Sequence, residues 1–220
     1  MANTYLKAAL ITLALTLLGF FFISQLDAMR ANEIRNGVDD LAFQSDTEHM
    51  LSLYAQVMDN SSTELCVYAS SSAQSQESQA YSLLEKINYY EKSNVVNSDY
   101  EKIKERYYLA NALLYLNIRA QDKYCGSSPY TTVLFFYRVK TDCPECRAQG
   151  GVLDSLRGKD QSLRVFAFPT DSGLPFINTF IKRHNITSAP SLVINDSLVL
   201  PGLQSEAEVD ARLANMSRHG

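Results

Sequence analysis

Two cysteines separated by two residues constrain this chain more than any other feature. The motif C-P-E-C, with Cys143 and Cys146 at its ends, lies between an apolar, β-rich run at 131–137 and a helix-like stretch at 147–156. Cys143 is therefore expected at a helix N-terminus, where unpaired N–H groups and the helix dipole favour a thiolate, the form that attacks disulfides. Cys146 would lie one turn along, close enough to attack a mixed disulfide at Cys143.

The last third of the chain alternates between strand-like and helix-like patterns. In order, the predicted elements are strand 131–137, helix 143–156, strand 162–168, helix 175–184, strands 191–195 and 197–200, and a helix from Ser205 to about Met216. Asp196 separates the two short strands and indicates a hairpin, and Ser205 and Glu208 form a capping box. The predicted order is β-α-β-α-β-β-α, an α/β domain.

A second motif, S-A-P-S-L-V-I at 188–194, makes the pattern more specific. It resembles the thioredoxin loop in which a cis-proline opens a strand and faces C-x-x-C. Residues 130–216 thus resemble the thioredoxin-like superfamily. The resemblance implies that Ala189–Pro190 is cis, that the Ala189 backbone pairs with a substrate strand, and that Cys143 is the nucleophile and Cys146 the resolving thiol. It implies no metal or organic cofactor, because the disulfide itself carries two electrons.

The chain departs from the family pattern near the cysteines. Tyr137 stands six residues before Cys143, where thioredoxins have a buried acid that assists proton transfer. Glu145 opposes a thiolate at Cys143, whereas Lys140 and Arg147 support it. The sequence therefore leaves the reduction potential open, and with it the choice between reductant, oxidant and isomerase.

The N-terminal segment 5–24 is predicted to be a transmembrane signal-anchor helix. Residues 8–23 carry no charge, and about 19 residues of helix span roughly 28 Å, close to a bilayer core of about 30 Å. The alternatives are a cleaved signal peptide, although 24–28 lacks an A-x-A pattern, and a buried helix of a soluble protein. The expected localisation is a single-pass membrane protein whose soluble part is extracytoplasmic, a setting that suits four cysteines.

The middle of the chain, 27–125, is predicted to be a helical domain that resembles no known family, followed by a thioredoxin-like domain at 128–220. Its predicted elements are an amphipathic helix at 48–58, a segment opened by the capping box 61–64, a loop or weak polar helix at 70–79, and helices at 79–92 and 98–122. The linker 94–97 indicates that the last two helices form an antiparallel hairpin. Ten of the thirteen tyrosines lie between Tyr54 and Tyr124, either as a bundle core or as a surface that binds a protein partner.

Cys66 and Cys125 stand apart from the C-x-x-C motif. If the domain lies outside the cytoplasm, a structural disulfide between them would close a long loop and stabilise the fold by about 2–4 kcal/mol. The alternatives are two free buried thiols, exchange of Cys125 with Cys143, and a zinc site formed by all four cysteines.

Composition narrows the function further. The net charge of −4 argues against nucleic-acid binding, and the three histidines are scattered without metal-ligand spacing. The sequence therefore predicts a membrane-anchored thiol–disulfide oxidoreductase that acts on protein thiols or disulfides. It would exchange electrons with a membrane redox partner or another thiol protein. The alternative is a thioredoxin-fold binding or scaffold module in which the Cys143–Cys146 bond is static.

Overall fold

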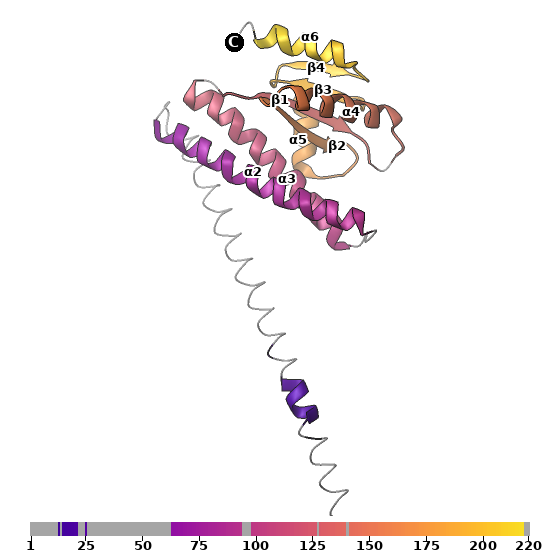
Figure 1. The fold of residues 1–220 in the computed structure, drawn as a ribbon. Helices are drawn as coiled ribbons and strands as arrows, with labels where there is room; N and C mark the ends of the chain where they lie inside the picture. Colours follow the sequence, from indigo (N-terminus) through magenta and orange to yellow (C-terminus); the bar gives the residue numbers. More distant parts are fainter. Residues whose placement is uncertain are drawn as a thin grey trace, which may run out of the picture. The chain divides into compact units, whose positions relative to one another are not determined.

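The structure is a computed structural model that describes residues 13, 15–21, 25, 63–93, 98–126, 128–139 and 141–217. The chain divides into two compact units, 1–60 and 61–220. The elements of the second unit are α2 (Thr63–Lys92), α3 (Ser98–Cys125), β1 (Thr131–Tyr137), α4 (Pro144–Lys159), β2 (Leu163–Pro169), α5 (Pro175–Arg183), β3 (Ser191–Ile194), β4 (Leu198–Pro201) and α6 (Glu206–Ser217) (Figure 1).

A four-stranded sheet in the order β2-β1-β3-β4 forms the centre of this unit. β1 pairs with β2 in parallel, whereas the β1–β3 and β3–β4 pairs are antiparallel. β1 reads T-T-V-L-F-F-Y, so β-branched and aromatic residues fill it, and its five central residues are buried. Burial on both faces is expected of a central strand between two helical layers.

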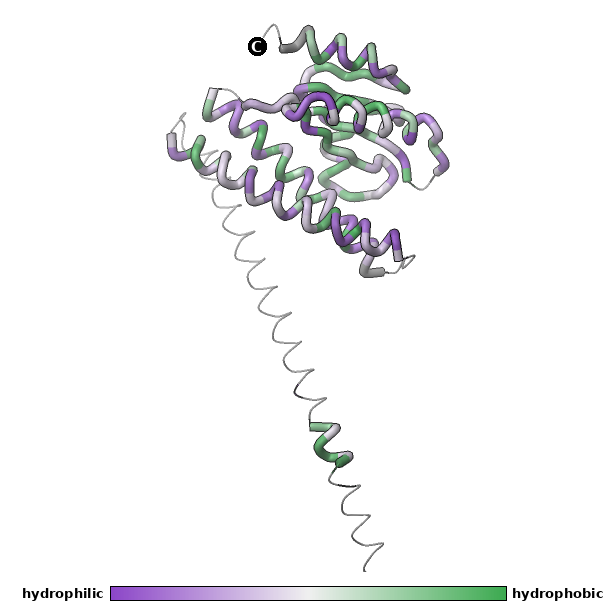
Figure 2. Tube along the Cα trace, in the orientation of Figure 1, coloured by the Kyte–Doolittle hydropathy of each residue, from purple (hydrophilic) through white to green (hydrophobic). Residues whose placement is uncertain are grey.

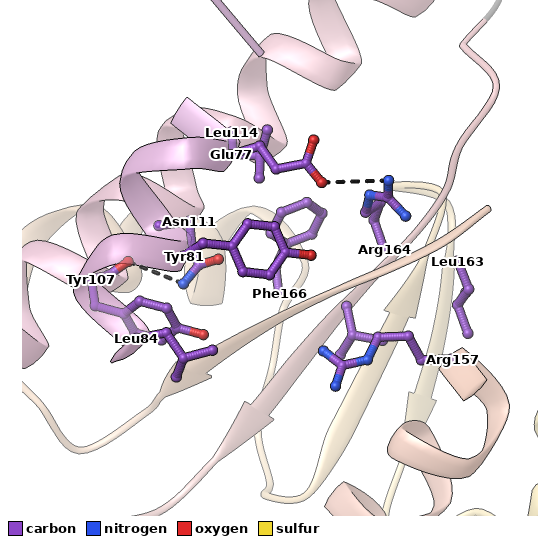
Figure 3. A pocket seen from close by; sticks show the side chains of 12 residues that line it. Glu77, Tyr81, Leu84, Tyr107, Asn111, Leu114, Arg157, Leu163, Arg164 and Phe166 are labelled. Atoms are coloured by element: carbon purple, nitrogen blue, oxygen red, sulfur yellow. Dashed lines mark hydrogen bonds and ion pairs between the residues drawn. The ribbon is translucent and has the colours of Figure 1, made fainter. Parts of the chain in front are cut away.

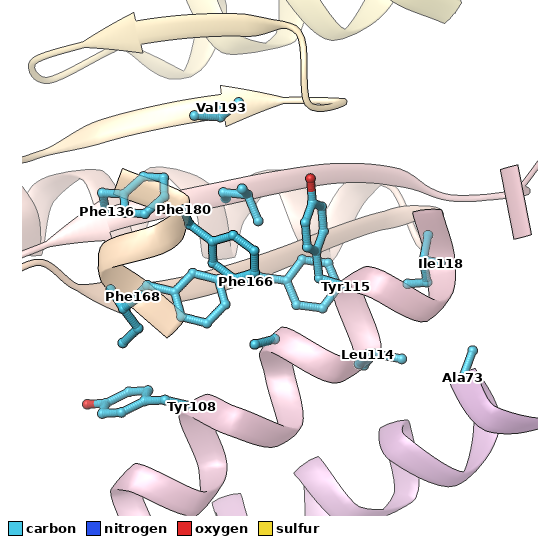
Figure 4. Close-up of a cluster of buried hydrophobic side chains, with 13 residues drawn as sticks. Ala73, Tyr108, Leu114, Tyr115, Ile118, Phe136, Phe166, Phe168, Phe180 and Val193 are labelled. Atoms are coloured by element: carbon cyan, nitrogen blue, oxygen red, sulfur yellow. The ribbon is translucent and has the colours of Figure 1, made fainter. Parts of the chain in front are cut away.

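One hydrophobic cluster lies on each face of the sheet, because successive side chains of a strand point to opposite faces. The cluster between the sheet and helices α3 and α5 includes Tyr115, Leu134, Phe136, Phe166, Phe168 and Phe180 (Figure 4). The cluster between the sheet and helices α4 and α6 includes Val133, Cys146, Leu153, Leu163, Leu192 and Val209. The pair of helices α2 and α3 therefore takes part in the same folded unit as the sheet.

The predicted hairpin and capping box are both confirmed. Asn195 and Asp196 turn between β3 and β4 with φ of 47° and 61°, in the left-handed region that Asn and Asp tolerate. At the start of α6, the Ser205 N–H donates to Oε2 of Glu208 at 2.8 Å, and the Glu208 N–H donates to Ser205 Oγ at 3.3 Å. These reciprocal bonds satisfy two N–H groups that a helix start leaves without partners.

Helix α2 continues through the Ser- and Gln-rich stretch 70–79 (Figure 2), so of the two predicted alternatives, a loop or a weak polar helix, the helix is the one that forms. In this stretch Ser72, Ala73 and Gln76 are buried. Small or uncharged polar side chains at these positions let α3 pack closely, so tertiary packing outweighs the low helix propensity of serine.

Helices α2 and α3 are antiparallel, as the linker pattern predicts. A disulfide between Cys66 and Cys125 joins the start of α2 to the end of α3. At the other end of the pair, the Tyr100 hydroxyl donates to Oε1 of Glu91 at 2.8 Å. These two contacts hold both ends of the pair.

The predicted transmembrane helix is wrong. Within the part of the chain that the structure describes, no helix has the length and apolar character needed to cross a membrane. Within 5–24, the structure describes Leu13 and residues 15–21, all in helical conformation. The rest of 5–24, like the predicted helix 48–58, lies outside the described residues. The membrane helix in the expected fold class and the single-pass membrane localisation are both corrected by this finding.

Candidate functional site

Cys143 and Cys146 form a disulfide at the start of α4, with Cα atoms 5.2 Å apart. Cys143 is the N-cap residue, and Pro144 occupies the first turn, where its missing N–H costs nothing. The Cys146 N–H donates to Sγ of Cys143 at 3.2 Å. The sequence folds this way because the C-x-x-C spacing brings the second cysteine one turn along the helix that the first one caps.

The two sulfurs differ in access. Cys146 is 5% exposed and belongs to the hydrophobic cluster beneath α4. Cys143 is half-buried and packs at the border of the same cluster. A partner molecule can therefore reach Cys143 first, which is the order that a nucleophilic and a resolving cysteine require.

One ion pair changes the balance of charge near Cys143. Nη1 of Arg147 lies 2.6 Å from Oδ1 of Asp142, and both side chains are mostly exposed. Arg147 therefore supports a thiolate less than its sequence position suggests, because a carboxylate partly neutralises its charge. Glu145 is exposed, and Lys140 lies outside the described residues.

The Ala189–Pro190 peptide bond is cis, as the thioredoxin resemblance implies. It directly precedes β3, in which Ser191 pairs with Phe136 near the end of β1. Since Cys143 follows the C-terminal end of β1, the cis bond and the cysteines lie at the same end of the strands. Ala189 and Cys143 also pack against the same hydrophobic cluster.

Two hydrogen bonds hold the loop that contains the cis bond. The Gly202 N–H donates to the Pro190 carbonyl at 2.8 Å, and Ser191 Oγ donates to the Ser188 carbonyl at 2.8 Å. Gly202 adopts a φ of +78°, a conformation that favours glycine. The loop around Pro190 is therefore fixed by contacts on both sides of the cis bond.

Tyr137 takes the position where thioredoxins have a buried acid. Its hydroxyl lies 3.2 Å from the hydroxyl of Tyr108 on α3. Burial, with the neighbouring Tyr108, raises the pKa of Tyr137 far above its ordinary value, and burial also raises the pKa of Tyr108. Both phenols stay protonated at neutral pH, so this position holds a neutral hydrogen-bonded pair where the family has a titrating carboxyl.

Asp171 is a residue near the site that the sequence analysis did not identify. It follows β2, and both of its carboxylate oxygens accept the Val139 N–H, at 3.0 and 3.1 Å. Val139 lies in the loop between β1 and Cys143, so Asp171 anchors the segment that leads into the motif. No sequence pattern marked this role, because the contact joins loops 32 residues apart.

The second disulfide, Cys66–Cys125, lies away from this end of the strands. Cys125 ends α3 and comes before β1, whereas Cys143 comes after β1. The seven residues of β1 span roughly 20 Å, so the two cysteines lie at opposite ends of this strand. The four sulfurs therefore do not converge on a zinc site, and Cys125 cannot exchange directly with Cys143 in this fold. Both helices of the pair are instead joined covalently at one end.

Comparisons with known proteins leave the family undetermined. No protein-family model and no curated protein matches the chain. Among solved structures, chloroplastic thioredoxin z is 19% identical and covers 48% of this chain and 88% of its own, with a TM-score of 0.37. The thioredoxin Deadhead from the Drosophila melanogaster germline is 22% identical, with 41% and 81% covered and a TM-score of 0.30. A malarial protein is 15% identical, with 39% and 96% covered and a TM-score of 0.32.

The fold of residues 131–217 is thioredoxin-like. The element order β-α-β-α-β-β-α, the parallel β1–β2 pair, the antiparallel β3–β4 hairpin and the cis-proline before β3 all follow that arrangement. Helices α2 and α3 precede this fold in the chain and are additions to it.

Proposed function

We propose that this protein is a thiol–disulfide oxidoreductase that acts on protein thiols or disulfides. The observation that carries the proposal is a disulfide at a helix N-terminus between a half-buried and a buried cysteine, at the same end of the sheet as a cis X-Pro bond. Cys143 is the nucleophile and Cys146 the resolving thiol. Interconversion of the Cys143–Cys146 dithiol and disulfide carries two electrons, so the exchange step needs no other redox group.

The reductive direction takes two balanced steps. The Cys143 thiolate attacks one sulfur of a substrate disulfide, forms a mixed disulfide and releases the other substrate sulfur as a thiolate. The Cys146 thiolate then attacks Sγ of Cys143, restores the Cys143–Cys146 bond and expels the second substrate thiolate. Two electrons pass to the substrate, and water protonates the released thiolates. The oxidative direction is the reverse of these steps.

The substrate approaches as an extended segment beside Pro190. The backbone of Ala189 pairs with that segment, and this pairing places the substrate sulfur over Sγ of Cys143. Ala189 is half-buried and packs on the same cluster as Cys143, which supports a role in orienting a substrate without taking part in sulfur exchange.

Trapping of mixed disulfides tests the roles of the two cysteines. Cys146→Ser should accumulate covalent complexes through Cys143, because the resolving thiol is missing. Cys143→Ser should accumulate few, since the remaining Cys146 is buried. Non-reducing gels with mass spectrometry of the linked peptides measure both. Equal trapping by the two variants would contradict the assigned roles.

A redox titration separates the enzyme from a scaffold module with a static bond. An enzyme should titrate reversibly, near about −270 mV for a reductant or near about −120 mV for an oxidant. A Cys143–Cys146 bond that resists mild reductant would favour the scaffold. Thiol labelling of the purified protein across a series of glutathione buffers gives the potential directly.

A further inference from the structure

The outer edge of β2 is open. β2 is the first strand of the sheet, and among the residues that the structure describes no strand pairs with its outer side. The Thr131 N–H donates to the Ser162 carbonyl, and Thr131 is in register with Leu163. In a parallel ladder this register turns the backbone groups of even-numbered β2 residues toward β1. Those of Val165 and Ala167 therefore face outward.

A pocket of about 90 Å³ runs along this edge (Figure 3). Its apolar wall includes Ala80, Leu84, Leu114 and Phe166, and the Tyr81 ring borders it from α2. Arg157 lines the same pocket from α4, which packs on the opposite face of the sheet from α3. The pocket therefore wraps around β2 and exposes the strand edge between two helical layers.

A second hollow of about 300 Å³ continues the first along α2. The two share Glu77, Leu114 and Arg164 as walls. The second is more polar, and its wall includes Gln121, which is 8% exposed and whose Oε1 accepts no hydrogen bond from the described residues. The two hollows therefore adjoin at these three residues, and the second lies mainly between α2 and α3.

The charges of the first pocket favour an acidic occupant. Its charged residues are Arg157, Arg164 and a single carboxylate, Glu77. Arg164 is held in place: its Nη2 lies 3.5 Å from Oε1 of Glu77, and its guanidinium lies 4.2 Å from the centre of the Tyr130 ring. Arg157 has an exposed side chain 3.4 Å from Asp154, and such surface pairs are weak enough to exchange partners.

We propose that the β2 edge binds an extended segment of a partner protein. The segment adds as a strand, with main-chain hydrogen bonds to Val165 and Ala167. It places an apolar side chain in the pocket between Tyr81 and Phe166, on the α3 face of the sheet, and the acidic side chains that flank it in sequence against Arg157, on the α4 face. A second copy of this chain fits poorly as the added strand, because β2 itself, L-R-V-F-A-F-P, carries no acidic residue to face Arg157.

Peptide binding tests the proposal on the full-length protein. The probe is a fluorescein-labelled peptide Thr-Val-Asp-Phe-Glu-Val-Thr, and its twin carries Lys in place of both acids. The acidic peptide should raise fluorescence anisotropy and protect the Val165 and Ala167 amides from hydrogen exchange. Its twin should bind at least about fivefold more weakly, as should the acidic peptide to Tyr81→Ala or Arg157→Glu.

Matched variants control for general stickiness and for loss of fold. Tyr89→Ala removes a tyrosine of similar exposure from the same helix, outside the pocket, and Arg106→Glu reverses a charge on α3; both should bind as the wild type does. Equal binding of the two peptides, protection elsewhere, or no binding at about 1 mM would overturn the proposal. So would a dimer in sedimentation that Tyr81→Ala abolishes, since a second copy would then be the occupant. Mixed-disulfide trapping at Cys143 should be unchanged in Tyr81→Ala, so this proposal and the oxidoreductase proposal fail separately.

Discussion

Single residues at the cysteine motif decide how this site can work. Cys143 caps α4 and is accessible, whereas Cys146 is 5% exposed, so the fold itself distinguishes the two sulfurs. Tyr137 is the main departure from the thioredoxin pattern, because a protonated phenol stands where thioredoxins have a buried acid. Deprotonation of Cys146 in the second step would then depend on solvent or on the leaving substrate thiolate.

Tyr137→Phe tests whether that phenol has a structural or a proton-transfer role. Removing the hydroxyl deletes the 3.2 Å contact with Tyr108, so the free energy of unfolding should fall by about 1 kcal/mol. Because burial keeps Tyr137 protonated, the pH profile of disulfide exchange should keep its shape. Urea unfolding and exchange rates between pH 5 and 9 measure the two effects. In Tyr108→Phe/Tyr137→Phe the stability losses should not add, since the two hydroxyls are partners; a shifted pH profile would indicate a proton-transfer role.

His184 makes stability depend on pH. Burial lowers the pKa of His184, whereas an unfolded histidine titrates near about 6.5. Below that pH the unfolded chain binds a proton at His184 that the folded chain resists. The free energy of unfolding therefore keeps its full contribution from His184 above about pH 6.5 and falls as the pH drops below it. Nε2 of His184 lies 3.1 Å from Oδ1 of Asp196. Burial opposes the charge of Asp196, but hydrogen bonds from Arg183 and Tyr115 outweigh it and lower its pKa, so Asp196 stays charged in this window.

The measurement is the melting temperature at pH 7.5 and 5.5. The wild type should lose stability between these values, and His184→Gln, which cannot titrate, should lose less. The same loss in both proteins would mean that other groups cause the dependence.

At the scale of elements, the Cys66–Cys125 disulfide is the main covalent constraint on the α2–α3 pair. It joins residues 59 apart, and closing a loop of this size restricts the unfolded chain. Replacing both cysteines by serine should lower the free energy of unfolding by about 2–4 kcal/mol. Disulfide-exchange activity should survive, because the Cys66–Cys125 bond lies at the opposite end of the strands from Cys143. Chemical unfolding and an insulin-reduction assay measure the two; loss of activity in a folded variant would contradict a purely structural role.

Elements with strong local signals could be predicted from the sequence. β1 carries five apolar or aromatic residues in a row, α6 opens on a capping box that the structure forms, and Asn195-Asp196 suits the left-handed turn before β4. The C-P-E-C motif located the start of α4 to within one residue. In each case the determinants are neighbours in sequence, so local physics alone was sufficient.

Elements that depend on distant partners could not be predicted. The sequence left 70–79 open between a loop and a weak polar helix, and the stretch is helical because α3 covers its small residues. The Asp171–Val139 and Tyr108–Tyr137 contacts join residues about 30 apart. The apolar run near the N-terminus suggested a membrane span from length and hydropathy alone, and the described residues do not contain such a helix.

At the scale of the whole molecule, α3 supplies part of the core of the thioredoxin-like sheet. Tyr115 packs edge-on against Phe166 and Phe180, with ring centroids 5.6 Å away in each case (Figure 4). Its hydroxyl also donates to Oδ1 of Asp196 in the β3–β4 turn at 2.8 Å. One side chain thus links α3 with β2, α5 and the hairpin, so the helical pair and the sheet should unfold together.

A fragment of residues 128–220 tests this coupling, because it lacks α2 and α3. Without α3, Phe166, Phe168 and neighbouring side chains on that face lose their cover, and an exposed apolar face of this kind promotes association. The fragment should bind the dye ANS, aggregate or unfold without a sharp transition, whereas the full chain should unfold in one transition that tyrosine fluorescence and circular dichroism report alike. In the full chain, Tyr115→Ala should destabilise by about 3–5 kcal/mol, as truncation of a buried aromatic ring does, and should do so for both probes together. A fragment that folds cooperatively on its own would show instead that α2 and α3 are an independent domain resting on a self-sufficient sheet.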